Sequence, residues 1–229
     1  IRLSLVGSEM CIRDSIYFKE IKERENKNTV FVLKSNRDKI PLGTTCIKTG
    51  RYFNFLEMGV IPEGIISLEF CEYFNHTLKK GHIPETVTHL TINNGFRHME
   101  KGSIPNSVTH LIFGENFNKM IDVGVIPNSV VYLKFGRVFN QSIKNVIPHN
   151  VKYLSLMYSF NQPISEEIYI DDTLKTISYI PKSVKYFDYE TSNDEFDFKI
   201  LSENITYLNI IINKHIYPGD IPSSVTRLE

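Results

Sequence analysis

Two histidines, His89 and His110, are the residues whose type and spacing come nearest to a chemical site. They lie at equivalent positions in two copies of the phrase "VTHL", 21 residues apart. Two imidazoles held close together could share a metal ion or respond to pH. A zinc site needs three or four ligands, and the equivalent residues on either side, Ser67 and Tyr132, are poor ones. We therefore expect histidines exposed on a sheet, with no metal and no cofactor.

Motifs for catalysis are missing from the sequence. There is no GxSxG, HExxH or P-loop pattern, and no cysteine–histidine pair with a third group to orient it. Glu166 and Glu167 are adjacent, and a pair of solvated charges in a loop is their ordinary explanation. We expect no enzymatic activity, so the elements that carry the repeated phrase become the main question.

Composition restricts the class of protein. The chain has 229 residues, 41% of them hydrophobic, and 26 basic side chains balance 26 acidic ones. This suits a folded domain with a substantial core and disfavours a nucleic-acid partner, which requires a basic surplus. Cys11, Cys46 and Cys71 form no close pair, which indicates a reducing, cytoplasmic setting. No apolar stretch is long enough to span a membrane.

An Ile-Pro phrase recurs along the chain every 20 to 22 residues, apart from one interval of 33. The copies begin at Ile40, Ile61, Ile83, Ile104, Ile126, Ile147, Ile180 and Ile221, with a degenerate copy at Leu201. Repeats of this length are typical of solenoids, because one short coil cannot bury its own apolar side without its neighbours.

Each copy carries apolar residues in an LxxLxL pattern, as at Val108, Leu111 and Phe113. A short strand places the last two on one face, and the whole pattern is the core of a leucine-rich repeat. We predict a leucine-rich-repeat-like solenoid with a parallel β-sheet on its concave face. Coils of 21 or 22 residues leave room only for short extended or 3₁₀ segments on the convex face. Proline belongs at the turn into each strand.

Phenylalanine and asparagine recur at fixed places in the remainder of each coil. The phenylalanines are Phe53, Phe74, Phe96, Phe117, Phe139 and Phe160. The asparagines that follow them are Asn54, Asn75, Asn118, Asn140 and Asn161, with Arg97 as the exception. Phe-Asn followed by Ile-Pro resembles the FNIP repeat family, well over residues 40–162 and less closely over 180–229. The resemblance implies a protein-interaction repeat without enzymatic activity, in some relatives attached to F-box or kinase domains.

The two columns that flank the central leucine should point outward onto the concave face, because side chains alternate along a strand. The candidate partner-binding residues there are His89, His110, Tyr132, Tyr153, Tyr186, Tyr207, Lys134 and Asp188. The tyrosines should stack from coil to coil, which favours recognition of a protein partner, although stacking that only stabilises the sheet is an open alternative. Stacked tyrosines could also bind carbohydrate. The asparagine column has a structural role: each side chain should be buried and should hydrogen-bond to the next coil.

We divide the chain into three parts. Residues 1–15 resemble a translated sequencing-adaptor peptide and are expected to be non-native, and residues 16–39 form an N-terminal cap with a charged helix and a strand at "TVFVL". Residues 40–229 form the solenoid, with an insertion at about 163–179 and an end that cuts a repeat short. Within the insertion we expect an exposed acidic loop at residues 166–172, which is a secondary contact candidate. The predicted function is a protein–protein interaction module, one setting for which is the recognition part of a larger scaffold or ubiquitin-ligase substrate receptor. A purely structural or surface-display solenoid is the alternative.

Overall fold

The computed structural model describes residues 30–190, 196–211, 215–217 and 219–229. Within them the chain winds into stacked coils, and each coil contributes one strand to a ten-stranded sheet in which all neighbours are parallel. The strands, in their order in the sheet, are β1 (Phe31–Leu33), β2 (Cys46–Thr49), β3 (Ser67–Glu69), β5 (His89–Ile92), β7 (His110–Phe113), β8 (Tyr132–Lys134), β9 (Tyr153–Leu156), β12 (Tyr186–Glu190), β13 (Tyr207–Ile211) and β14 (Arg227–Leu228).

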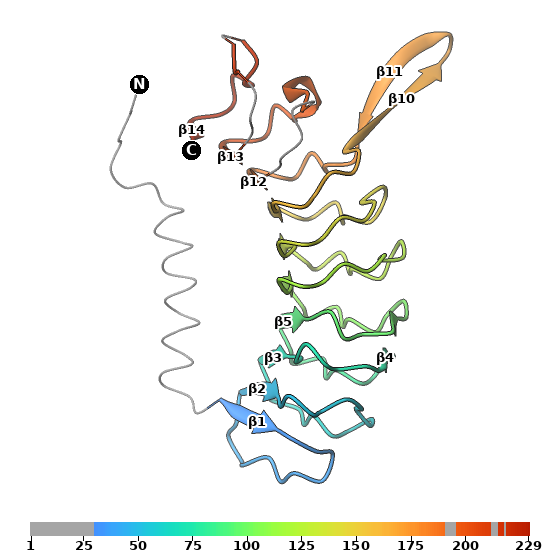
Figure 1. Cartoon of the computed structure of the whole chain (residues 1–229), viewed down its shortest axis with the longest axis vertical. Helices are drawn as coiled ribbons and strands as arrows, with labels where there is room; N and C mark the ends of the chain where they lie inside the picture. The colour runs from blue at the N-terminus through green and yellow to red at the C-terminus, as the bar shows by residue number, and fades with distance from the viewer. Residues whose placement is uncertain (1–29, 191–195, 212–214, 218) are drawn as a thin grey trace.

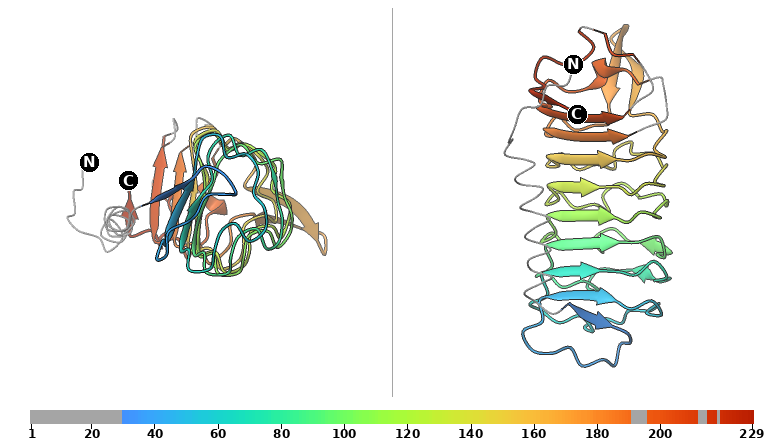
Figure 2. Two further views of the ribbon diagram at one scale, coloured as in Figure 1. Left: turned by 90° about the horizontal axis from the view of Figure 1, so that it is seen from below. Right: turned by 60° about the vertical axis from the view of Figure 1, so that its left-hand side comes forward.

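The sheet lines the inner side of an arc, as predicted. In Figure 1 the strands follow the concave edge and the return segments lie outside it. In Figure 2 the strands form one continuous ladder. The outer segments of the described coils are short: β4 (Thr77–Leu78) pairs with β6 (His98–Met99), and η1 (Phe198–Ile200) is a 3₁₀ helix. The described part of the chain holds no helix long and apolar enough to cross a bilayer.

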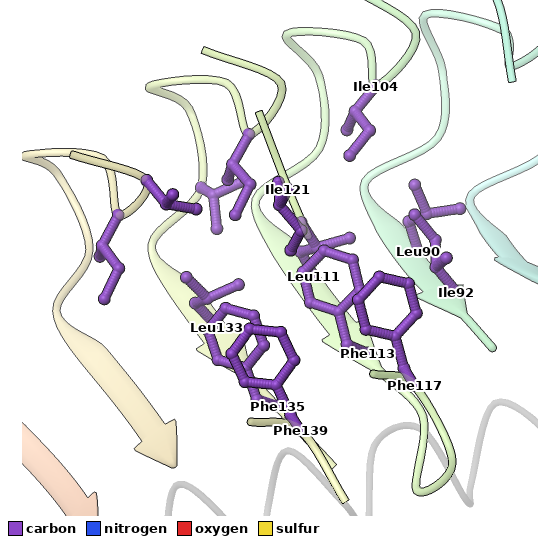
Figure 3. Close-up of a cluster of buried hydrophobic side chains, with 14 of the residues drawn as sticks. Leu90, Ile92, Ile104, Leu111, Phe113, Phe117, Ile121, Leu133, Phe135 and Phe139 are labelled. Carbon is purple, nitrogen blue, oxygen red and sulfur yellow. The ribbon is translucent and has the colours of Figure 1, made fainter. Parts of the chain in front are cut away.

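The LxxLxL columns form the core. Val108, Leu111 and Phe113 of one coil are fully buried, and the same holds for the equivalent residues of the next coil. The phenylalanine column lies behind the strands, where Phe117 packs against Phe113 with ring centroids 4.5 Å apart. Figure 3 shows these rings with Phe135 and Phe139 of the following coil. Burial of the apolar face therefore requires both neighbours of each coil.

Proline occupies the turn into most strands of the large sheet, and Ser202 takes its place before β13. The carbonyl of Pro105 accepts a hydrogen bond from the amide of Val108 at 3.1 Å, and the following coils repeat this bond at Pro127 and Pro148. Such a turn uses the fixed φ of proline and never requires its missing N–H. The Ile-Pro phrase is thus the corner at which each coil enters the sheet.

Close packing between two coils restricts the residues that follow Phe113 and Phe135, which are Gly114 and Gly136. A Cβ atom on Gly136 would lie 2.2 Å from the carbonyl oxygen of Gly114 in the preceding coil, well inside van der Waals contact. Glycine in both coils lets the two backbones approach each other closely.

The insertion at about 163–179 projects from one face of the solenoid as expected, but the expected acidic loop is wrong. This segment forms an antiparallel hairpin of β10 (Ser165–Ile170) and β11 (Thr173–Ser178), which extends from the outer side of the arc (Figure 1). The two isoleucines and the tyrosine of "SEEIYI" suit a strand, and a two-residue connection closes the hairpin. Composition alone suggested a loop because four carboxylates in the segment outweighed its β-branched residues.

At the N-terminal end, β1 pairs with β2 and extends the sheet by one strand. Residues 1–15 and the expected charged helix near residues 17–26 lie outside the described residues.

Candidate protein-binding face

The structure brings one outward-facing column of side chains into register along the concave face. Cα pairing aligns successive strands so that each member lies beside the next. The column comprises Cys46, Ser67, His89, His110, Tyr132, Tyr153, Tyr186, Tyr207 and Arg227. The candidate histidines and tyrosines therefore share one strip, which we call the ring column.

Ring stacking continues over four consecutive coils. The imidazoles of His89 and His110 are nearly parallel, at 7°, with centroids 4.5 Å apart. His110 lies 5.6 Å from the ring of Tyr132, which stacks on Tyr153 at 4.3 Å and 4°. These separations are close to the strand spacing of a sheet, so the stacking follows from the register of the strands.

The C-terminal part of the ring column is arranged differently. Tyr186 and Tyr207 are 6.3 Å apart and tilted by 47°. The guanidinium of Arg227 lies over the Tyr207 ring at 5.4 Å, and the Tyr207 hydroxyl donates a hydrogen bond to Glu229 at 2.8 Å. The hydroxyl of Tyr207 thereby lowers the pKa of the Glu229 carboxyl. This part of the face combines an aromatic ring with a charged pair.

The two histidines are half-buried rather than exposed as expected, and each ring has a hydroxyl beside it. Nδ1 of His89 lies 2.7 Å from Oγ1 of Thr88, and Nδ1 of His110 lies 2.9 Å from Oγ1 of Thr109. Burial, and secondarily the nearby His89, lowers the pKa of His110 to about 4. At neutral pH the His110 ring is therefore uncharged, and it stacks as a planar polar group.

The second outward-facing column is polar. Lys48 forms an ion pair with Glu69 at 2.6 Å, and Lys134 lies in register between Ile112 and Ser155. Farther along, Asp188 accepts hydrogen bonds from neighbouring strands on both sides. Its donors are Ser155 Oγ at 3.0 Å, Tyr153 Oη at 3.4 Å and Asn209 Nδ2 at 2.9 Å. Both carboxylate oxygens of Asp188 thus already accept hydrogen bonds from within the sheet.

The asparagine column connects coils, but its side chains are not buried as expected. Oδ1 of Asn118 accepts a hydrogen bond from the backbone amide of Asn140 at 2.9 Å, and Asn140 accepts one from Asn161 at 3.0 Å. Asn75 instead accepts from Nε of Arg97 at 3.2 Å, so the exception in the column still bonds to its neighbour. Asn140 is half-buried, and the other four, Asn54 among them, are exposed. The turn lies at the surface, where the amide reaches the next coil from outside.

A hydroxyl column that sequence reasoning missed also joins the coils. Ser107 Oγ donates to the carbonyl of Val87 at 2.7 Å, and Ser129 Oγ donates to that of Val108 at 2.7 Å. Ser183 Oγ donates the equivalent hydrogen bond to the carbonyl of Val151. The signal in the sequence is the third residue after each isoleucine, which is serine, threonine or asparagine in most copies.

A second group of aromatic side chains, also missed, lies on the first two full coils outside the sheet. Arg51 lies 5.2 Å from the ring of Tyr73, and the rings of Phe55 and His76 meet edge to face at 4.4 Å. Tyr52 is exposed beside them in sequence. The positions equivalent to Tyr52 and Tyr73 become Asn116 and Ser159 in later coils, and this loss of aromatic character was the available signal.

The parallel sheet, short outer segments and LxxLxL core define the chain as a leucine-rich-repeat-like solenoid. Residues 97–137 and 139–188 match the model of the FNIP repeat family. These two segments match the FNIP repeat, which confirms the resemblance that the sequence suggested.

A solved structure described as that of CroV588, a novel circular LRR protein, is similar to this chain. The two share 26% sequence identity with a TM-score of 0.54 over 88% of this chain. The match covers 35% of that protein, so this chain spans about a third of its length. The fold is therefore shared with an arc of a larger leucine-rich-repeat structure, and the repeat family is consistent with a protein-interaction module.

Proposed function

We propose that the protein is a non-enzymatic interaction module that binds a protein partner along its concave strand face. The observation that carries this proposal is the ring column, in which His89, His110, Tyr132 and Tyr153 stack in register over four coils. Aromatic side chains supply large contact area with few rotatable bonds, and they are enriched among residues that dominate binding energy.

The side chains on the concave side of the sheet support the same proposal. The concave side carries two adjacent columns, one rich in aromatic rings and one mostly polar, and the partner would meet both together. Tyr132 and Ser155 are buried within these columns, so their neighbours supply most of the accessible surface. Lys134 and Asp188 place opposite charges two coils apart in the polar column, which gives the face a direction along the solenoid axis. Repeats keep the buried positions constant while these outward positions differ from coil to coil, so specificity belongs to the outward positions.

The cellular setting is part of the proposal. The module would be the part of a larger scaffold, or of a ubiquitin-ligase substrate receptor, that recognises the partner. Cys46 and Cys71 are buried free thiols, which suits a reducing compartment such as the cytoplasm.

Replacement of Tyr132, Tyr153 and Tyr186 together by serine tests the proposal. In the matched control, Tyr52 and Tyr158, which are exposed outside the sheet, are replaced by serine. We expect the concave-face variant to lose the partners captured from source-cell lysate, and the control to keep them, with both proteins folded by circular dichroism. Unchanged partners in a folded concave-face variant would reject binding at this face and favour a purely structural solenoid.

A further inference from the structure

Among the residues that the structure describes, the β10–β11 hairpin has no counterpart in the other coils. Asp171 and Asp172 close it with φ angles of 48° and 60°, which is the left-handed geometry of a type I′ turn. Ser165 and Ser178 face each other at the base as partners in the ladder. The inserted residues therefore form a defined projection whose two ends start and finish at the same place on the coil.

The base of the hairpin is fixed to the solenoid. Lys144, in the preceding coil, forms an ion pair with Glu166 at 2.5 Å, and its Nζ atom lies 5.9 Å from the ring of Tyr179. The amide of Tyr179 donates to the carbonyl of Ile164 at 2.7 Å, which closes the ladder at the foot of the hairpin. These contacts hold the projection in one direction, away from the concave face (Figure 1).

The hairpin exposes apolar side chains that the solenoid leaves uncovered. Tyr169 and Leu174 are ladder partners near the tip and are 76% and 48% exposed, while Ile170 and Ile177 are also exposed. Within the described residues β10 and β11 form a two-stranded sheet of their own, so neither strand has a second strand neighbour; β11 lies near η1, which leaves the outer edge of β10 as the more open one. An isolated two-stranded hairpin is only marginally stable in water, and exposed apolar patches mark sites of interaction.

The charge of the hairpin selects among possible occupants. Glu167, Asp171 and Asp172 are exposed carboxylates, against the single ammonium group of Lys175, while Glu166 is already paired. A second copy of the same hairpin would bring these carboxylates together and would be repelled. A partner strand with basic side chains would be attracted to the same edge, and its apolar side chains could cover Tyr169 and Leu174.

We propose that the β10–β11 hairpin is a second docking surface, which binds a partner protein by pairing with an extended segment of alternating basic and apolar residues. The recognition mode is strand addition to a free edge: main-chain hydrogen bonds supply affinity, and the alternating side chains supply specificity. This surface lies apart from the concave face, so the solenoid could hold two partners at once.

Two synthetic peptides test the proposal with the intact protein. In the first, lysine alternates with valine; in the second, glutamate replaces every lysine. Binding is measured by isothermal titration calorimetry at low and high salt. We expect the lysine peptide to bind about tenfold more tightly than the glutamate peptide at low salt, and this preference to shrink at high salt.

Three variants assign the binding to the hairpin. Deletion of residues 166–177 joins Ser165 to Ser178 and returns this coil to the length of its predecessor. The double change Asp171→Asn with Asp172→Gly removes two charges but keeps the turn geometry. The deletion should abolish binding of the lysine peptide, and Tyr169→Ser with Leu174→Ser should weaken it about tenfold. The turn variant should weaken it by a smaller factor.

Four outcomes would overturn the proposal. They are equal affinity for the two peptides, no binding of the lysine peptide, binding that survives the deletion, and a wild-type dimer that the deletion converts to a monomer. The last outcome would assign the hairpin to a second copy of the chain. The concave-face tyrosine variant should bind the lysine peptide as the wild type does, so the result is independent of the partner on the concave face.

Discussion

Replacement of Phe117 by alanine should strongly destabilise the solenoid, because this ring connects two layers of the core. Phe117 is fully buried, its ring centroid lies 4.5 Å from that of Phe113 in its own coil, and it stacks at 6.2 Å on Phe139 in the next coil. The change removes most of a large apolar side chain and leaves a cavity between coils that cannot close without moving the strands.

The expected cost follows from this burial. A fully buried phenylalanine truncated to alanine costs about 3–5 kcal/mol in the free energy of unfolding. Phe117→Leu, which keeps much of the volume but loses both ring contacts, should cost about 1–2 kcal/mol. Met120→Ala, at a side chain 73% exposed in the same coil, should stay within about 0.5 kcal/mol of the wild type.

Urea denaturation followed by circular dichroism measures the three differences, and amide hydrogen exchange locates them. Since each coil contacts only its neighbours, protection should fall most in β7 and β8 and least in β2. A cost below about 1 kcal/mol for Phe117→Ala would refute the role of the ring as a connection between core layers. Equal loss of protection in every strand would refute the nearest-neighbour reasoning.

Three further changes test other parts of the account. Gly136→Ala places a methyl group against the backbone of Gly114 and should cost about 1–3 kcal/mol, seen as a lower urea midpoint; an unchanged midpoint would contradict the close approach. The pKa of His110 is about 4 in the folded protein, below the ordinary histidine value, so its contribution to stability should be lost as pH falls from about 6.5 toward 4. His110→Gln should flatten this part of the stability–pH curve, and identical curves would exclude a desolvated ring. Asn118→Ala removes the acceptor for the Asn140 amide and should cost about 0.5–1.5 kcal/mol in a urea titration, whereas no change would show that water replaces the bond.

The repeat length was sufficient to predict the register of the sheet. Because the copies differ by at most two residues over most of the chain, counting from each isoleucine places Tyr132 beside Tyr153 and His89 beside His110. Alternation along a strand then separates the buried leucines from the outward rings. Both steps depend only on local geometry, which the sequence encodes directly.

Other features depend on three-dimensional relations that a single coil does not contain. Burial of Asn118 was expected, but its side chain is exposed and accepts the bond from the next coil at the surface. The hairpin was missed because its carboxylates dominated its composition, although Asp171 and Asp172 tolerate the left-handed conformation that its turn requires. The second aromatic group depends on Arg51 and Tyr73 lying in adjacent coils outside the columns that were considered.

Site-specific photo-crosslinking tests the central claim, recognition by the concave face, most directly. A crosslinking amino acid placed at Thr91, beside the ring column, is compared with one at Met120, which is exposed outside the sheet. The account predicts that the Thr91 probe captures a defined protein partner, and that the capture is lost when Tyr132 and Tyr153 become serine. Capture of the same partner from Met120 alone, or capture from Thr91 that is indifferent to the tyrosines, would contradict it.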